Sequence, residues 1–171
     1  MTPPGIAIVT DVSITALPAA PLYAFEIWSN PASVSERFNA VFSFALPTMG
    51  HSGGNDILRL IRYEPSVWLI EGDPSTLPGI LADDGTLTAI GGGIVRIRLS
   101  GKGWRTLLME GGVFNAESPN FVVGCSAATV IDHVAVRLQV VNEMTCDAYV
   151  PLSLSKGLMH FWQQAALNLE P

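Results

Sequence analysis

The sequence predicts an α+β fold. Runs that read as strands and runs that read as helices follow each other in the order β-α-β-β twice along the chain. Most of the strands are joined by hairpin turns, and this pattern favours antiparallel sheets with the helices on one side. The chain has 171 residues, of which 49% are hydrophobic, so it can fill one sizeable core. We therefore expect two ferredoxin-like β-α-β-β units packed as one compact domain.

The expected boundaries follow from the same pattern. Residues 1–21 carry four prolines, which predicts an N-terminal arm or an edge strand. Residues 22–171 form the single domain, with internal halves at about 22–88 and 89–171. Between the halves lies the triple glycine Gly91–Gly93, which is typical of a bend or of a close backbone approach.

The first half begins with a strand and a helix. Leu22–Trp28 alternates and is rich in β-favouring side chains, so it predicts a strand. Asn30-Pro31 then opens a helix, with Ser33 and Glu36 as an alternative capping box, and Pro47 ends it. The apolar residues of this helix share one stripe: Val34, Phe38, Val41, Phe42 and Ala45.

The rest of the first half is mostly strand. We expect a loop at His51–Asn55, followed by the strands Ile57–Tyr63 and Val67–Glu71 around a Glu64–Ser66 turn. Pro74–Gly85 has room for at most one short helix. This order completes the first β-α-β-β unit.

The second half repeats the order. A strand at Ile94–Leu99 precedes a helix from about Gly101 to Glu110, which Gly111-Gly112 would cap. Strands follow near residues 125–131, 133–141 and 145–150. A last helix starts at Ser153, a suitable N-cap, and its apolar face comprises Leu154, Leu158, Phe161, Trp162, Ala165 and Leu169.

Charge and hydropathy exclude several classes of partner. The 9 Lys+Arg against 15 Asp+Glu give a net charge of -6 without any basic cluster, which argues against nucleic acid and anionic membranes. No window approaches the roughly 18 apolar residues that a membrane span needs. The first basic residue is Arg37, so a signal peptide is not indicated and we expect a cytoplasmic protein. Because only 14% of residues are charged, part of the surface should meet another protein.

The motifs that suggest chemistry fail on spacing. Around Gly101-Lys102, a phosphate-binding loop would need a glycine five residues before Gly101 and a Ser or Thr after Lys102. Arg96 and Gly103 occupy these two positions, so the sequence predicts a strand-to-helix joint here. The three histidines lack metal-ligand spacing, and Asp132-His133 reads as a hairpin corner rather than a catalytic dyad. We expect no catalytic, cofactor-binding or metal-binding residue in this chain.

Carboxylates, cysteines and tryptophans leave alternatives open. Folding could pair some of the carboxylates, although Asp83–Gly85 reads as a solvated turn; the candidates are Glu26, Glu71, Asp73, Asp83 and Asp84. Cys125 and Cys146 lie in apolar runs and should be reduced core residues. Trp68 and Trp162 should be core, whereas Trp104 fits either the core or an interface. Trp104, Phe114 and Asn115 are the candidate partner-interface residues.

Three motifs carry a resemblance to a known family. They are the hairpin Glu64–Leu69, the run Leu99–Gly101 followed by Leu107-Leu108 and Gly111, and the segment Tyr149–Ser153 leading to Phe161-Trp162. In these motifs, and in the order of elements over roughly residues 22–167, the chain resembles the gamma subunit of heterotetrameric sarcosine oxidase. That resemblance implies the fold of the glycine-cleavage T-proteins.

The resemblance also implies a role beside catalysis. In such oxidases the alpha and beta chains carry FAD, FMN, NAD and tetrahydrofolate, and the gamma chain packs against them; a delta chain is a further partner. The expected function is thus a non-catalytic small subunit of an enzyme that oxidatively demethylates sarcosine or a similar N-methyl amino acid. The alternatives are a stand-alone folate-binding protein and a related dehydrogenase complex for N-methylglutamate or dimethylglycine. T-proteins hold folate with an Asp-Asp segment after a glycine, which the Thr129–Val134 hairpin lacks.

Overall fold

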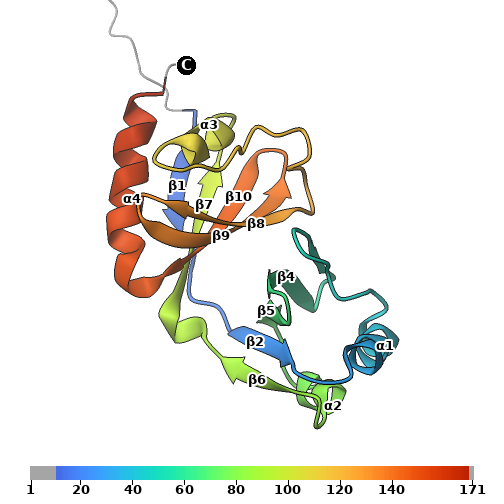
Figure 1. Cartoon of the computed structure of the whole chain (residues 1–171). Coiled ribbons are helices and arrows are strands. Elements are labelled where there is room, and N and C mark those ends of the chain that lie inside the picture. Colours follow the sequence, from blue (N-terminus) through green and yellow to red (C-terminus); the bar gives the residue numbers. More distant parts are fainter. Residues whose placement is uncertain (1–10, 170–171) are drawn as a thin grey trace, which may run out of the picture.

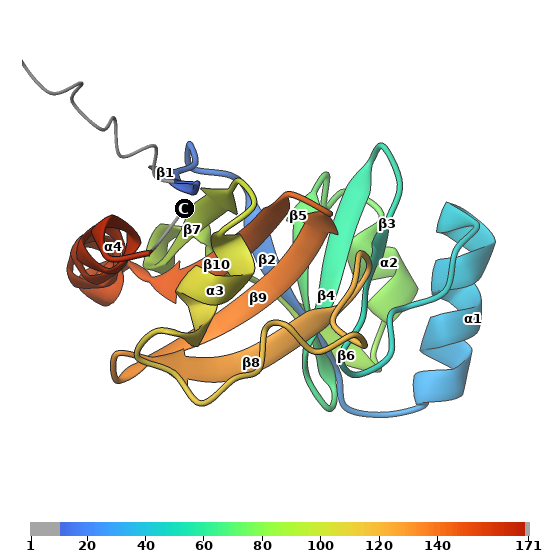
Figure 2. The same ribbon diagram turned by 90° about the horizontal axis from the view of Figure 1, so that it is seen from above.

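The computed structural model describes residues 11–169, which contain two five-stranded antiparallel sheets with helices on their outer faces (Figure 1). The N-sheet has the strand order β3-β4-β5-β2-β6, and the C-sheet has the order β1-β7-β10-β9-β8. Helices α1 and α4 lie at opposite ends of the molecule, with both sheets between them (Figure 2). This arrangement confirms the α+β class and the two ferredoxin-like units.

The N-sheet and its helices occupy the first half of the chain. Their bounds are β2 (Leu22–Ile27), α1 (Pro31–Phe42), β3 (Ser52–Gly54), β4 (Leu58–Glu64), β5 (Val67–Gly72), α2 (Leu77–Leu81) and β6 (Gly85–Ala89). The buried residues of α1 and α2 belong to one apolar cluster with Phe25, Trp68 and Ile70 of the sheet. Both helices therefore cover the same face of the N-sheet.

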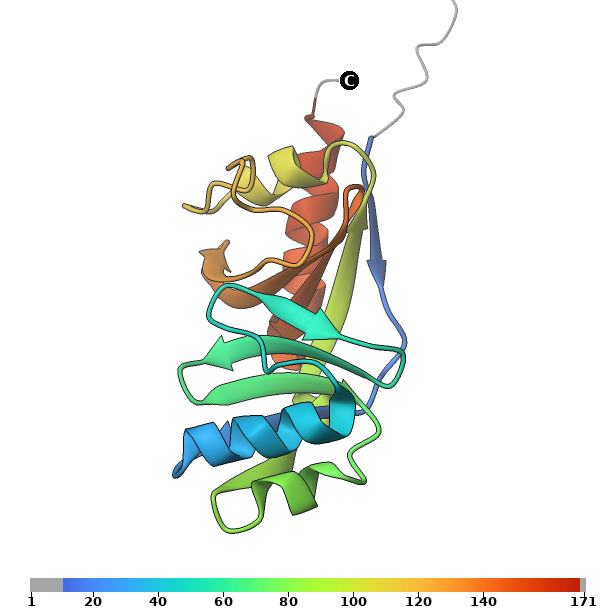
Figure 3. The ribbon, with the colours of Figure 1, turned by 90° about the vertical axis from the view of Figure 1, so that its right-hand side faces the viewer.

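The C-sheet takes its strands from both ends of the chain. Its elements are β1 (Ser13–Ala16), β7 (Ile94–Ser100), α3 (Trp104–Met109), β8 (Ser126–Ile131), β9 (Val134–Asn142), β10 (Thr145–Pro151) and α4 (Leu152–Leu167), and the short 3-10 turn η1 (Gly91–Gly93) precedes them. A second apolar cluster, which includes Trp104, Leu107 and Trp162, fills the space under α3 and α4. Strands of the two sheets run in crossed directions (Figure 3).

The two sheets correspond strand by strand. Read from β3 to β6, the N-sheet order matches the C-sheet order read from β8 to β1. In this correspondence β1 takes the place in the C-sheet that β6 takes in the N-sheet, because each pairs antiparallel with the first strand of its unit. The described part of the expected N-terminal arm is thus an edge strand of the second unit, while residues 1–10 lie outside the described part of the chain.

Two strands differ from expectation. Ser52–Gly54 is the edge strand β3, paired with Arg59–Ile61, where a loop was predicted at His51–Asn55. Gly85–Ala89 forms β6 beside β2, where no strand was predicted. Both are short edge strands rich in small residues, so their conformation comes from the neighbouring strand and not from an alternating apolar pattern.

The ends of the long helices also differ. Helix α1 stops at Phe42 because Ser43 takes a left-handed conformation with φ of 61°, so Ala45 lies beyond the helix and is exposed. Val41 lies inside the helix but is exposed as well, so neither residue belongs to the buried stripe. Helix α4 begins at Leu152, directly after β10, and Ser153 therefore lies inside the helix and does not cap it. Leu154, expected on the buried face, is exposed.

Asp84 joins the two helices of the N-sheet. Its Oδ2 accepts a hydrogen bond from Arg37 Nη2 at 2.8 Å, and its Oδ1 accepts one each from Ser29 Oγ and Asn30 Nδ2 at 2.8 Å. Asn30 occupies the N-cap position of α1 but gives its side chain to this contact instead of capping. The Asp83–Gly85 segment is therefore an anchored corner, not the solvated turn that the sequence predicted.

These contacts predict how acid affects the fold. The hydrogen bond from Arg37, followed by those from Asn30 and Ser29, holds the pKa of Asp84 below its usual value of 3.8. A carboxylate with a lowered folded-state pKa stabilises the protein above its unfolded pKa and loses that contribution as pH falls through the folded pKa. Asp84→Asn should thus lower the free energy of unfolding at pH 6–8, and the difference from wild type should shrink as pH falls below 3.8 and vanish below the lowered folded-state pKa. Urea unfolding at a series of pH values measures this, and a difference that is the same at pH 3 and pH 7 contradicts it.

The pairing of β1 predicts the effect of truncation. A chain that starts at Leu17 lacks β1 and Val12, which is buried in the C-sheet core. Its free energy of unfolding should fall by about 2 kcal/mol or more, since burying one valine side chain contributes about 1.5–3 kcal/mol. The matched control starts at Asp11 and keeps the strand. Equal urea midpoints for the two truncations would show that β1 adds nothing to stability.

Candidate functional site

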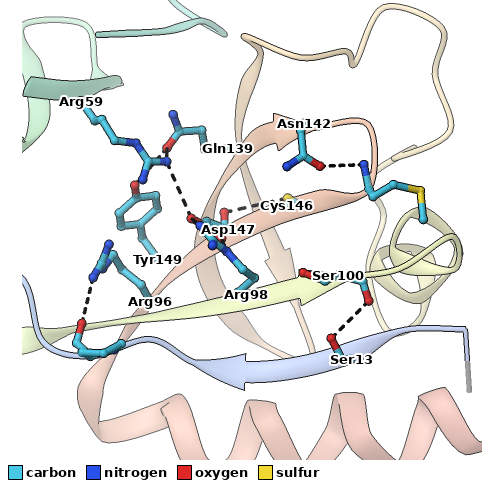
Figure 4. Close-up of polar contacts among 12 residues, drawn as sticks. Ser13, Arg59, Arg96, Arg98, Ser100, Gln139, Asn142, Cys146, Asp147 and Tyr149 are labelled. Atoms are coloured by element: carbon cyan, nitrogen blue, oxygen red, sulfur yellow. Dashed lines mark hydrogen bonds and ion pairs between the residues drawn. The ribbon is translucent and has the colours of Figure 1, made fainter. Parts of the chain in front are cut away.

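The largest gathering of ionised side chains lies between the two sheets. Arg59 of β4 and Glu71 of β5 come from the N-sheet, and Arg96, Arg98 and Asp147 come from β7 and β10 of the C-sheet; these five residues form the inter-sheet ion cluster. Figure 4 shows Arg59, Arg96, Arg98 and Asp147 of this cluster. Their strand neighbours, among them Leu58, Ile97, Leu99 and Cys146, face the helices. Alternation along each strand thus separates the apolar side that faces the helices from the side between the sheets, where the ion cluster is accompanied by a small apolar cluster of Leu22, Ile61, Leu69 and Tyr149.

Two arginine–carboxylate pairs hold the cluster. Arg98 Nε and Nη2 donate to the two oxygens of Asp147 at 2.7 and 2.8 Å, and the Asp147 side chain is 0% exposed. This hydrogen bond raises the pKa of Arg98, against the opposing effect of partial burial. Arg96 Nη1 contacts both oxygens of Glu71 at 2.9 Å across the sheets, and its Nη2 donates to the Pro18 carbonyl at 2.8 Å.

The fifth member, Arg59, has weaker contacts. Its guanidinium lies 3.9 Å from Glu71 and 3.8 Å from Asp147. It also donates to Gln139 Oε1 at 3.4 Å, an oxygen that accepts the Tyr149 hydroxyl at 3.0 Å as well. Burial raises the pKa of the Tyr149 hydroxyl, so the hydroxyl stays protonated and donates this hydrogen bond. A cavity of about 390 Å³, lined in part by Arg59 and Gln139, opens beside these side chains.

This arrangement joins the sheets and leaves no reactive group free. Both carboxylates are engaged by arginines, and burial raises the pKa of the neighbouring Cys146 thiol so that it stays protonated. Within residues 11–169, no three His, Cys, Asp or Glu side chains come together as metal ligands. Of the two free cysteines, Cys146 is buried as expected, whereas Cys125 is partly exposed. The sequence did not reveal this cluster, because its members come from four strands.

The three candidate interface residues occupy different environments. Trp104 is 1% exposed, packs in the C-sheet core, and donates its Nε1 hydrogen to the Glu143 carbonyl at 3.0 Å. Its side chain is thus a core residue and not accessible to a partner. Phe114 is partly buried, with its ring centre 4.8 Å from that of Phe121, and Asn115 is exposed. Phe114 and Asn115 stay proposals for an interface.

Arg105, which the sequence did not single out, fixes the loop that holds these residues. Its Nη1 donates to the carbonyls of Ala116 and Phe121, both at 2.7 Å, and its guanidinium lies 4.2 Å from the centre of the Trp104 ring. An arginine that hydrogen-bonds two carbonyls of one loop and stacks on an aromatic ring gives that loop a defined conformation. Trp104 and Arg105 therefore support the 111–125 loop from beneath.

The remaining motifs behave as the sequence predicted. Asp132 and His133 form the exposed corner of the β8–β9 hairpin, with φ angles of 45° and 65°. Gly101–Gly103 joins β7 to α3, and a side chain at Gly101 would collide with the Asp11 carbonyl. Gly111, after α3, has a φ of 66° and packs against Phe161.

Comparison with known proteins defines the fold. No family model matches the chain, and none of the curated proteins matches it in sequence. The structure resembles that of aminomethyltransferase T of the glycine cleavage system from Bartonella henselae, with a TM-score of 0.62 and 15% identity over 92% of this chain. This chain spans 46% of that protein. The class that this likeness defines is the T-protein-like α+β fold.

A second solved structure matches over nearly the whole length of both chains. It is a chain of heterotetrameric sarcosine oxidase from Corynebacterium sp. U-96, solved in complex with pyrrole 2-carboxylate, with a TM-score of 0.82 and 15% identity. The match covers 94% of this chain and 87% of that chain. At this identity the likeness establishes the fold. Within residues 11–169, no helix combines the length and apolar content that crossing a membrane requires.

The ion cluster predicts the effect of breaking a pair. Arg98→Met leaves the buried Asp147 carboxylate without its two hydrogen bonds, so it should lower the free energy of unfolding by about 3 kcal/mol. Replacing both partners, Arg98→Met with Asp147→Leu, should recover most of this loss because no buried charge is left unpaired. Lys156→Met on the exposed side of α4 is the control. Urea unfolding measures the stability of all three variants. An Arg98→Met variant that is as stable as wild type contradicts the role of the pair.

Proposed function

We propose that the chain is a non-catalytic small subunit, of the gamma kind, in a heterotetrameric flavoenzyme that oxidatively demethylates sarcosine or a similar N-methyl amino acid. The observation that carries this proposal is the match to a chain of heterotetrameric sarcosine oxidase over 94% of this chain and 87% of the other. The proposal that this chain takes an equivalent place in an equivalent assembly is an analogy from this shared fold, which extends over almost the full length of both chains.

In this proposal the inter-sheet ion cluster has a structural role, because both of its carboxylates are hydrogen-bonded to arginines. In this proposal the alpha, beta and delta chains are the partners, and the alpha and beta chains carry FAD, FMN, NAD and tetrahydrofolate. The complex works in the cytoplasm, and this chain supplies a binding surface.

Purification from the native host tests the proposal. The tagged chain should elute together with larger chains in a fixed ratio, and the eluate should show the absorption bands of bound flavin. Oxygen consumption should rise when sarcosine is added. A colourless monomer without any larger chain contradicts the proposal. Assays with dimethylglycine and N-methylglutamate distinguish a related dehydrogenase complex, which would act on one of these amines instead.

A stand-alone folate-binding protein is the second candidate. Its basis is the likeness to aminomethyltransferase T and the cavity beside Arg59 and Gln139. Calorimetric titration of the isolated chain with tetrahydrofolate, together with tryptophan fluorescence, tests it. Saturable binding that Arg59→Met abolishes would favour this candidate, with Arg37→Met as the matched control on the far side of the N-sheet. No heat and no change in fluorescence would remove its basis.

A further inference from the structure

An exposed apolar surface lies where α3, the following loop and β8 meet. Gly112 forms an antiparallel bridge with Ile131, and the Asp132 amide donates to the Gly111 carbonyl at 2.9 Å. Val113 and Val130 therefore flank one backbone bridge, next to Met109 at the end of α3. We call the surface formed by Met109, Glu110, Val113, Glu117, Val130 and Asp132 the α3–β8 face. Val113 is 96% exposed, and Met109 and Val130 are exposed as well.

The valines of this face are held in place. Arg105 fixes the loop through the carbonyls of Ala116 and Phe121, and Phe114 and Phe121 pack beneath it. Gly111 lies so close to Phe161 that a side chain there would collide with the ring. These contacts fix the backbone of the loop, so the Val113 side chain stays exposed to solvent. An apolar contact surface that is already ordered loses little conformational entropy on binding.

The charge on this face has one sign. From Thr106 to Val136 the sequence contains no lysine or arginine, yet Glu110, Glu117 and Asp132 are all exposed. Glu117 accepts a hydrogen bond from Thr106 at 3.1 Å on α3, so its carboxylate lies beside that helix, near Glu110. Across the described residues, these three carboxylates have no arginine or lysine within ion-pair distance. The apolar surface is therefore bordered by unneutralised negative charge.

This charge decides between two kinds of occupant. A symmetric dimer through the face would bring the same three carboxylates of both copies together, and like charges at an interface cost several kcal/mol. Nor can this chain supply cations from elsewhere, because its seven arginines all contact groups of their own chain. Lys102 and Lys156 are the remaining basic residues. A second copy is thus a poor occupant.

We propose that the α3–β8 face binds a different protein through an apolar surface bordered by lysine or arginine. This inference rests on the proposed function, in which that protein is one of the large flavin-carrying chains. Complementary charge around an apolar contact accelerates association and excludes wrong partners. The contact residue is Val113, with Met109 and Val130 beside it, while Glu110, Glu117 and Asp132 select the basic border.

Affinity purification of the full chain from the native host tests the inference. Val113→Glu should lower recovery of the flavin-carrying chains by about tenfold or more, because it places a charge in the apolar contact. Glu110→Lys with Glu117→Lys should weaken recovery at low salt and remove its salt dependence. The controls are Ile57→Glu and Glu36→Lys, which are exposed positions in the N-sheet unit. Thermal unfolding of each variant shows that the fold is kept.

The outcomes separate the surface from the function. If wild type recovers the flavin chains and Val113→Glu recovers them equally well, the α3–β8 face is not the interface but the proposed function holds. Wild type that recovers no flavin chain overturns the proposed function, and the inference fails with it. Light scattering of the purified chain should report a monomer. A dimer that Val113→Glu dissociates would make a second copy the occupant and overturn the inference.

Discussion

The buried carboxylate of Asp147 is the constraint on which the arrangement of the sheets depends. Asp147 stands directly opposite Arg98 in the β7–β10 ladder and takes two hydrogen bonds from it. A slip of one residue would turn Asp147 toward the apolar core under α3 and α4, where nothing could neutralise it, so this pair fixes the register. Arg96 lies on β7, two residues before Arg98, and its hydrogen bonds to Glu71 of β5 fix the position of the N-sheet relative to the C-sheet.

The same cluster engages three of the seven arginines of the chain with two carboxylates in the space between the sheets. Because the arginines contact groups of their own chain, the outer surface keeps a surplus of negative charge around exposed apolar side chains. The internal use of cations thus produces the surface on which the α3–β8 face depends.

Sequence patterns predicted the long elements and the edge strand β8 well, and they predicted the edge strands β1, β3 and β6 poorly. Strands β2, β4, β5, β7, β9 and β10 carry alternation or β-favouring side chains, and each lies close to where the pattern predicts. The edge strands β3 and β6 lack such a pattern, and β1 pairs with a strand whose Ser100 is 87 residues away from Ser13. Trp104 was ambiguous because a tryptophan beside a glycine fits a core and an interface equally; its burial depends on Glu143 and Phe121, which are distant in sequence.

The sequence by itself determined the fold class, the order of the elements, the strand-to-helix joint at Gly101–Gly103 and the hairpin corner at Asp132-His133. These are set by local periodicity and by backbone conformations that glycine and short polar residues permit. Only the tertiary structure decided which carboxylates meet arginines, that β1 completes the second sheet, and that Arg105 holds the 111–125 loop from beneath. Such contacts join residues that are far apart in the sequence and follow no regular spacing, so sequence periodicity cannot predict them.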